Sequence, residues 1–188
     1  MLELEKVDFE LIKDQLKKRY IAFDSETTGL NPKENRIIEL GAVLFENGKA
    51  VKKFNTLVNA KVEISSFITE LTGINNEMLK NEPNEEVAYS MLKEFFDTAL
   101  QGDIIICGHN ARFDMSFLQE TFNRLNLSGK IRYVDTLALS RKYLKGLPNY
   151  KQGTVADYLN IKITNAHRAY DDAYVCGQIL NYIIKMAL

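Results

Sequence analysis

Two carboxylate residues in the segment AFDSETTGL, residues 22–30, are spaced so that they can bind a cation together. An apolar run precedes them and predicts a strand, in which side chains alternate between two faces. Asp24 and Glu26 would then share one face, and Ser25 would point away from them. Carboxylates are ligands of hard divalent cations, and two such ions about 3.5 to 4 Å apart can hydrolyse a phosphodiester. A strand that ends in a solvated turn would explain the same residues, so this segment alone leaves both interpretations open.

The segment GHNARFD, residues 108–114, places a third carboxylate after a second apolar run. Residues 104–107 predict a buried strand, and apolar residues at helical spacing after Ala111 predict a helix. Asp114 would lie in the first turn of this helix, just beyond the carboxyl end of the strand, where ligands gather in open α/β sheets. An acidic residue there would also complement the helix dipole without any further function.

The segment AHRAYDD, residues 166–172, contains one of the two histidines of the chain, His167. An imidazole can take a proton from a metal-bound water near neutral pH, so His167 is the candidate general base. The other histidine, His109, lies in the second segment, where we expect it to form hydrogen bonds within its turn. The spacing leaves the metal ligand of the third segment open between Asp171 and Asp172. Asp171 would share the face of His167 only if His167 were already helical.

These three segments resemble, in the same order, the three motifs of the DEDD superfamily of 3′-to-5′ exonucleases, in its histidine-containing branch. FDSETTGL is similar to the first motif, HNARFD to the second and HRAYDD to the third. The segments at 37–43, 68–79 and 134–141 also resemble the proofreading exonuclease of bacterial replicative polymerases. The resemblance extends from Tyr20 to the end of the chain. Arg168 stands where the tyrosine-containing branch has its tyrosine, which favours the histidine branch.

The resemblance implies four metal ligands and one general base, all of them catalytic: Asp24, Glu26, Asp114, Asp172 and His167. The ligands would hold two divalent metal ions, Mg²⁺ or Mn²⁺. The family has four residues between the histidine and the aspartate, which selects Asp172 over Asp171. We therefore expect His167 in the loop, or at the first-turn junction, before the last helix.

Cations and aromatic rings are densest in the segment from residue 141 to residue 151. Cations that follow the backbone, with rings that stack on bases, are the usual means of binding a single strand without reading its sequence. We predict that Arg141, Lys142 and Lys145 line the groove that leads the substrate to the metals. A solvated helix end, with cations that complement its dipole, is the alternative. Two further candidate substrate-binding residues, Thr27 and Phe113, lie within the first two motifs.

The resemblance implies hydrolysis of the 3′-terminal phosphodiester of single-stranded DNA with release of nucleoside 5′-monophosphates, in proofreading or repair. A DNA polymerase is the candidate protein partner. A 3′-to-5′ exoribonuclease acting on short RNA or RNA 3′ ends would use the same five positions, and the motifs do not separate the two. An alternative of another class is a non-catalytic nucleic-acid-binding or polymerase-associated subunit on the same fold. Such a subunit would not need all five catalytic residues.

The composition is that of one globular domain, with 188 residues, 46% of them hydrophobic and 26% charged. A net charge of −1 is unusual for a nucleic-acid-binding protein, but two Mg²⁺ ions would change it to +3. Cys107 and Cys176 have no paired spacing, so we expect reduced thiols. Neither a membrane-spanning run nor the pattern of a signal peptide is present, so we expect no membrane association and a cytoplasmic location.

The order of the predicted elements indicates an α/β fold. Residues 1–19 are expected to be an N-terminal helical extension, and residues 20–188 the single exonuclease domain. Three strands would form an antiparallel meander, and later strands would add to it in parallel. The resemblance implies a ribonuclease H-like exonuclease fold with a mixed five-stranded sheet flanked by helices. The expected strands and helices lie near 20–25, 36–46, 50–58, 65–71, 84–100 and 168–186, with alternating strands and helices through 103–145.

Three residues and one short segment outside the motifs have predicted local roles. Asp135 ends an apolar strand, so we expect a helix cap and not a further metal ligand. Glu39 interrupts an apolar run and must be hydrogen-bonded or lie near the sheet edge, where a supporting role is open to it. The segment 154–157 resembles a capping box that opens a helix. Gln152 stands where the family usually has leucine, which puts the packing of that loop in doubt.

Overall fold

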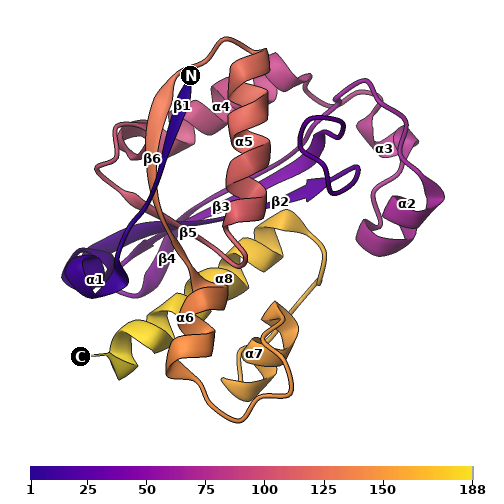
Figure 1. Ribbon diagram of the computed structural model, residues 1–188. Coiled ribbons are helices and arrows are strands. Elements are labelled where there is room, and N and C mark those ends of the chain that lie inside the picture. The colour runs from indigo at the N-terminus through magenta and orange to yellow at the C-terminus, as the bar shows by residue number, and fades with distance from the viewer. Residues whose placement is uncertain (188) are drawn as a thin grey trace.

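The computed structural model of the chain describes residues 1–187. It contains one mixed β-sheet with helices on both faces (Figure 1). The order of the strands across the sheet is β1-β6-β5-β2-β3-β4. β2, β3 and β4 form the expected antiparallel meander, and β2, β5, β6 and β1 run parallel to one another. The strands are β1 (Leu2–Lys6), β2 (Arg19–Thr27), β3 (Ile37–Glu46), β4 (Lys49–Leu57), β5 (Ile105–Gly108) and β6 (Gly129–Asp135).

The sheet has six strands, so the prediction of five is wrong. The additional strand is β1, which lies within residues 1–19, where the sequence predicted only a helix. β1 pairs in parallel with β6, and Leu2 lies opposite Gly129. Its five residues contain few apolar side chains, and its partner is far away in the sequence, so local pattern did not reveal it. The division between residues 19 and 20 remains a prediction.

The helices lie close to their predicted positions, and polar side chains cap several of them. Asp135 caps α6 by accepting a hydrogen bond from the Leu137 backbone N–H at 3.0 Å, as predicted. The capping box predicted at 154–157 is wrong, because α7 already begins at Gln152. No helix within residues 1–187 is both long and apolar enough to cross a bilayer. The helices are α1 (Phe9–Lys18), α2 (Ser66–Thr72), α3 (Asn76–Leu79), α4 (Glu85–Phe96), η1 (Asp97–Leu100), α5 (Arg112–Arg124), α6 (Thr136–Tyr143), α7 (Gln152–Tyr158) and α8 (Ala169–Met186).

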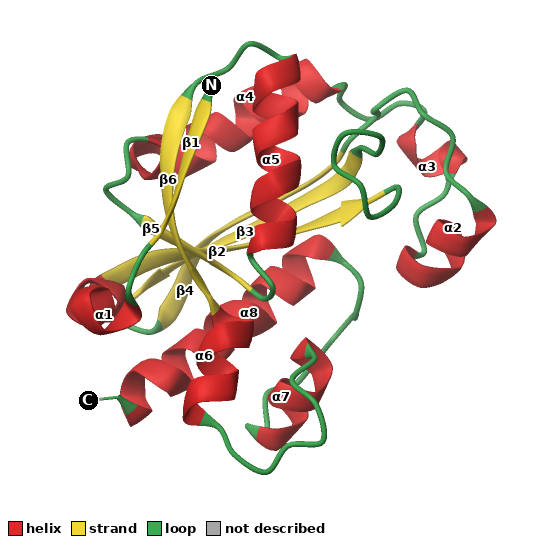
Figure 2. Cartoon of the chain, viewed as in Figure 1, coloured by secondary structure: helices red, strands yellow, loops and turns green. Residues whose placement is uncertain are grey.

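Helices cover both faces of the sheet (Figure 2), and two large apolar cores pack between helices and strands. α1, α6, α7 and α8 contribute to one core, where Phe45 and Ile179 are fully buried. α4 and α5 contribute to the other, where Phe23 and Phe117 are buried. Each such side chain contributes about 1.5 to 3 kcal/mol by burial. The two thiols are buried and free in the first core, as expected.

The strand directions bring the three motifs to one edge of the sheet. The carboxyl ends of the parallel strands β2, β5 and β6 lie on the same side, and α5 and α6 begin there. The first turn of α8 crosses close over β3 at Gly41, which pairs with Asp24 of β2. A Cβ atom on Gly41 would lie 2.1 Å from the Ala169 carbonyl carbon. Glycine at this position therefore lets α8 begin beside the end of β2.

Candidate functional site

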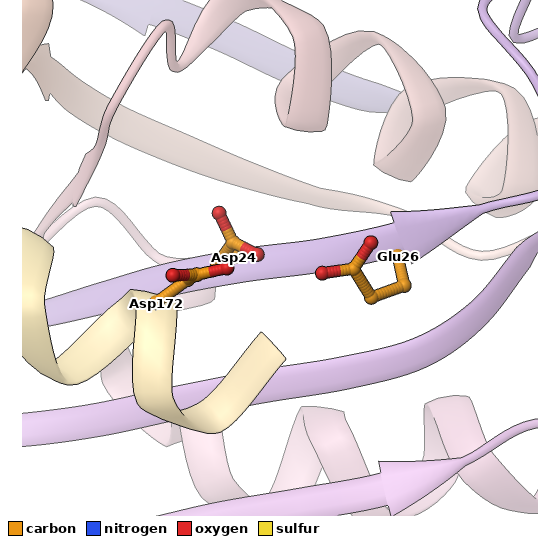
Figure 3. Close-up of side chains that lie close together, drawn as sticks. All are labelled: Asp24, Glu26 and Asp172. Carbon is orange, nitrogen blue, oxygen red and sulfur yellow. The ribbon is translucent and has the colours of Figure 1, made fainter. Parts of the chain in front are cut away.

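Three carboxylates converge where β2 ends and α8 begins (Figure 3). Asp24 and Glu26 project from the same face of β2, as the alternation of strand side chains predicts. Asp172, in the first turn of α8, points toward them. Each residue offers one oxygen, and these three oxygens lie within 4.8 Å of one another. This spacing allows a single cation to contact all three side chains.

Asp114 lies beside this cluster and is fixed to β2. Its side chain is 3% exposed, and its Oδ1 accepts hydrogen bonds from the Ser25 backbone N–H at 3.0 Å and the Ser25 hydroxyl at 2.7 Å. Its negative charge contributes to raising the pKa of Asp24 and of Glu26. Ser25 is a site residue that sequence reasoning missed, because its partner is 89 positions away.

Burial, followed by mutual repulsion, raises the pKa of Asp24 well above its ordinary value and that of Glu26 to about 8. Burial also raises the pKa of Asp114 to about 7. Burial raises the pKa of Asp172, although hydrogen bonds from His167 and Gln152 oppose the shift. None of the ion pairs formed by residues 1–187 includes any of these four carboxylates. A set of oxygen donors with unbalanced negative charge fits hard divalent cations.

His167 precedes α8 in a left-handed conformation, with φ of 61°. Such a conformation is uncommon outside glycine and often marks a functional site. The His167 backbone N–H donates to Asp172 Oδ2 at 2.9 Å, so the loop and the first turn of α8 hold each other. Asp171 instead accepts a hydrogen bond from Asn165 at 3.3 Å. His167 is therefore not helical, and Asp172, not Asp171, enters the carboxylate cluster.

An ion pair between buried Glu39 and partly exposed Arg168 fixes the start of α8. Glu39 of β3 is fully buried, and Arg168 Nη2 lies 2.7 Å from its Oε1. The Ala169 backbone N–H donates to Glu39 Oε2 at 3.1 Å, and Asn55 donates to Oε1 at 3.2 Å. Glu39 is thus hydrogen-bonded, as the sequence required, and supports the backbone that presents His167 and Asp172.

The prediction that His109 forms hydrogen bonds within its own turn is wrong, because both ring nitrogens contact residues far along the chain. The His109 Nε2 lies 2.8 Å from the Tyr150 carbonyl and its Nδ1 3.0 Å from the Thr136 hydroxyl. Since a carbonyl only accepts, Nε2 carries the proton. Burial lowers the pKa of His109, which keeps the ring neutral. His109 therefore joins the end of β5 to the segment before α7.

A cleft of about 780 Å³ opens from the carboxylate cluster. Asp24, Asp172 and His167 line it, and so do Arg141, Tyr150 and Lys151, which we call the cleft wall. Two cations and an aromatic ring in the same cleft as the carboxylates suit a phosphate backbone with attached bases. Lys151, which was not among the predicted substrate-binding residues, lines this cleft.

The structure does not bring all the predicted substrate-binding residues to the cleft. Lys142, adjacent to Arg141 in α6, points to α1 and forms an ion pair with Glu10 at 2.8 Å. Lys145 Nζ donates to the Arg141 carbonyl at 3.3 Å. The Thr27 hydroxyl donates to the Gly29 carbonyl at 2.7 Å, within the turn after β2. The Phe113 ring packs on Phe117 of the same helix, with ring centres 5.0 Å apart.

Comparisons with known proteins agree with this geometry. The family model described as Exonuclease, of the RNase T type, matches residues 21–180. The chain is 40% identical over 171 residues to a DNA polymerase III PolC-type from Caldanaerobacter subterraneus subsp. tengcongensis. It is 37% identical over 173 residues to the DNA polymerase III PolC-type from Halalkalibacterium halodurans. These alignments cover 91% and 92% of the chain, but the chain spans only 12% of either relative.

Solved exonuclease structures share the fold. E. coli exonuclease I in complex with a dT13 oligonucleotide superposes with a TM-score of 0.75 at 18% identity, over 88% of this chain and 41% of that one. Exonuclease X in complex with 5′ overhanging duplex DNA gives a TM-score of 0.69 at 22% identity, over 89% of this chain and 90% of that one.

The mixed sheet, with an acidic cluster at its strand ends, defines an exonuclease of the ribonuclease H-like fold. Divalent metal ions are implied by this class of enzyme, and the cluster offers their ligands. The chain belongs to the RNase T-type exonuclease family and is a 3′-to-5′ exonuclease of the DEDDh type.

The raised pKa values predict how pH and metal control stability. Between pH about 5 and 8, folded Glu26 keeps a proton that the unfolded chain has released, since its pKa rises from 4.5 to about 8. Folding is therefore less favourable as pH rises through this window when no metal is bound. Thermal unfolding in EDTA should give a Tm that falls less with pH for Glu26→Gln than for the wild type, and Mg²⁺ should raise the wild-type Tm most near pH 8. Identical dependence of Tm on pH in the two proteins would contradict the raised pKa of Glu26.

Proposed function

We propose that this exonuclease hydrolyses the 3′-terminal phosphodiester of single-stranded DNA and releases nucleoside 5′-monophosphates, in proofreading or repair. The observation that supports it most is the carboxylate cluster, because two of its members, Asp24 and Asp172, line a cleft that two cations also line. The similar E. coli exonuclease I was solved in complex with dT13 and dA16 oligonucleotides and in a complex with ssDNA. The similar sequences belong to polymerases, so we propose a DNA polymerase as partner and the cytoplasm as location.

We propose that Asp24, Glu26, Asp114 and Asp172 bind two divalent ions, Mg²⁺ or Mn²⁺. Bound there, the ions would activate water and stabilise the charge that develops on the departing 3′ oxygen. Other residues of the chain hold these carboxylates in position. Asp24 and Glu26 are carried by a central strand, Asp114 is fixed through Ser25, and Asp172 is fixed by the His167 backbone.

We assign His167 the role of general base. Its side chain is exposed at the cleft, next to the carboxylates, and the imidazole forms no hydrogen bond with any residue from 1 to 187. An imidazole in this setting can take the proton of the attacking water near neutral pH. The left-handed backbone and the bond to Asp172 keep the residue at the mouth of the site.

The cleft wall supports a role in holding the strand. Arg141 and Lys151 offer positive charge to phosphates, and Tyr150 offers a ring beside them. We therefore assign backbone binding to Arg141 and Lys151. Lys142 is left out because it is engaged by Glu10. A pure binding subunit would need the cations of the wall but not the complete set of carboxylates, which favours catalysis.

Hydrolysis of matched single-stranded DNA and RNA tests the proposed substrate. Both oligonucleotides have equal length and sequence and carry a label at the 5′ end, so that shortening from the 3′ end gives a ladder. With Mg²⁺ or Mn²⁺, the DNA should be shortened faster and release nucleoside 5′-monophosphates. Faster shortening of the RNA would identify an exoribonuclease instead, and no shortening of either would support the non-catalytic alternative.

Two adjacent aspartates test the metal-ligand assignment. Asp172→Asn should lower kcat on single-stranded DNA by at least about a hundredfold, in line with loss of a metal contact. Asp171→Asn, one position away and bonded to Asn165, should change kcat by less than about threefold. Thermal unfolding in EDTA would show that both variants fold. A larger effect of Asp171→Asn would mean that the first turn of α8 presents the other residue to the site.

Two cations that line the cleft, Arg141 of α6 and Lys151 before α7, test the proposed groove. Arg141→Gln combined with Lys151→Gln should raise KM on single-stranded DNA and reduce its dependence on salt, because fewer phosphates are neutralised. Hydrolysis of the p-nitrophenyl ester of thymidine 5′-monophosphate, which has no further phosphates, should be unchanged. Lys142→Gln is the matched control, since Lys142 points away from the cleft. An equal rise in KM for Lys142→Gln, or an equal loss on both substrates, would disprove the groove.

A further inference from the structure

Gln152, the first residue of α7, contacts a proposed metal ligand on another helix. Its Nε2 lies 3.2 Å from Asp172 Oδ1 and 3.1 Å from the Asp172 carbonyl oxygen. The other carboxylate oxygen, Oδ2, accepts the His167 backbone N–H at 2.9 Å. Each oxygen of Asp172 therefore receives one neutral N–H donor and keeps a further lone pair for a cation.

The segment that carries Gln152 is itself held on several sides. His109, at the end of β5, donates from Nε2 to the Tyr150 carbonyl at 2.8 Å. The Tyr150 hydroxyl donates to the Leu144 carbonyl at 3.0 Å, just beyond α6. The Lys151 backbone N–H donates to the Asn149 side chain at 3.0 Å. Gln152 thus extends from a fixed wall of the cleft, not from a free loop.

We propose that Gln152 is a positioning residue of the metal centre, which holds the Asp172 carboxylate in its binding orientation and joins it to the cleft wall. This inference rests on the proposed role of Asp172 as a metal ligand. The Glu39 ion pair fixes the backbone at the start of α8, but it does not contact the Asp172 side chain. The orientation of that side chain depends on the His167 N–H and on Gln152.

The chemistry of an amide suits this task. A lysine or arginine at position 152 would also orient Asp172, but its charge would compete with the cation. An amide donates a hydrogen bond without neutralising the carboxylate. Residues that orient metal ligands in this way typically change metal affinity about 10- to 100-fold when they are removed. The same bond makes α7, which follows the cationic wall, part of the support of the metal site.

Gln152→Met tests the proposal, because methionine has a similar length and no N–H donor. Mn²⁺ binding is measured on the full chain without substrate, by electron paramagnetic resonance of free Mn²⁺. The variant should bind at least one Mn²⁺ about tenfold more weakly than the wild type. Its kcat should be low at limiting Mn²⁺ and should recover when Mn²⁺ is saturating. Gln119→Met is the matched control, since the Gln119 amide donates to the Leu2 carbonyl at 3.0 Å, at the amino end of β1.

Thermal unfolding in EDTA separates a positioning role from a loss of folding. Gln152→Met should unfold at a temperature close to that of the wild type, and Gln152→Leu provides a second side chain of similar volume. Equal Mn²⁺ affinity in the wild type and in a folded Gln152 variant would overturn the proposal and leave the proposed function intact. A wild type that binds no Mn²⁺ would instead overturn the proposed metal centre, and this inference with it.

Discussion

Mutual repulsion among buried carboxylates is the physical constraint on which the rest of this structure depends. Asp24, Glu26 and Asp172 bring oxygens within 4.8 Å of one another, and Asp114 adds its charge beside them. Partial burial reduces the water and counter-ions that would moderate this repulsion at the surface, so the pKa values of Glu26 and Asp114 rise. Each ionised carboxylate that is buried without a partner destabilises the fold by on the order of several kcal/mol. A divalent cation removes this cost, and the chain has to hold the ligands together until one binds.

Strands and helices, and not loops, carry the four carboxylates. Asp24 and Glu26 lie on the strand at the centre of the sheet, between β5 and β3. Gly41 lets the backbone of α8 approach, and the Glu39–Arg168 ion pair keeps it there. Hydrogen bonds to Asp114 and to Asp172 then orient the individual carboxylates. Since repulsion would drive these side chains apart, every contact that resists such movement also contributes to metal affinity.

The local sequence pattern was enough to predict part of the site but not the rest, and the physical reasons can be named. Alternation along a strand is a short-range property, so the shared face of Asp24 and Glu26 could be predicted. The choice of Asp172 over Asp171 depends on where α8 begins, which is set by contacts of Arg168 and Ala169 with the distant residue Glu39. The spacing left that choice open, and only the family resemblance selected Asp172. Composition drew attention to the dense run of cations, but it could not tell which side of α6 faces the cleft.

Long-range contacts explain the remaining differences between sequence and structure. β1 depends on pairing with β6, more than a hundred residues later, so its short sequence had little predictive value. Lys142 is drawn away from the cleft by Glu10, which is 132 positions away. Gln152 could be recognised only as a departure from the family, because its contact with Asp172 exists only after α7 and α8 have packed.

A crystal structure with Mn²⁺ and thymidine 5′-monophosphate, recorded near the manganese absorption edge, tests the central claim most directly. The account predicts two anomalous peaks in contact with Asp24, Glu26, Asp114 and Asp172, with the phosphate beside them and His167 facing it. Anomalous peaks away from these carboxylates, or no peak at saturating Mn²⁺, would contradict it.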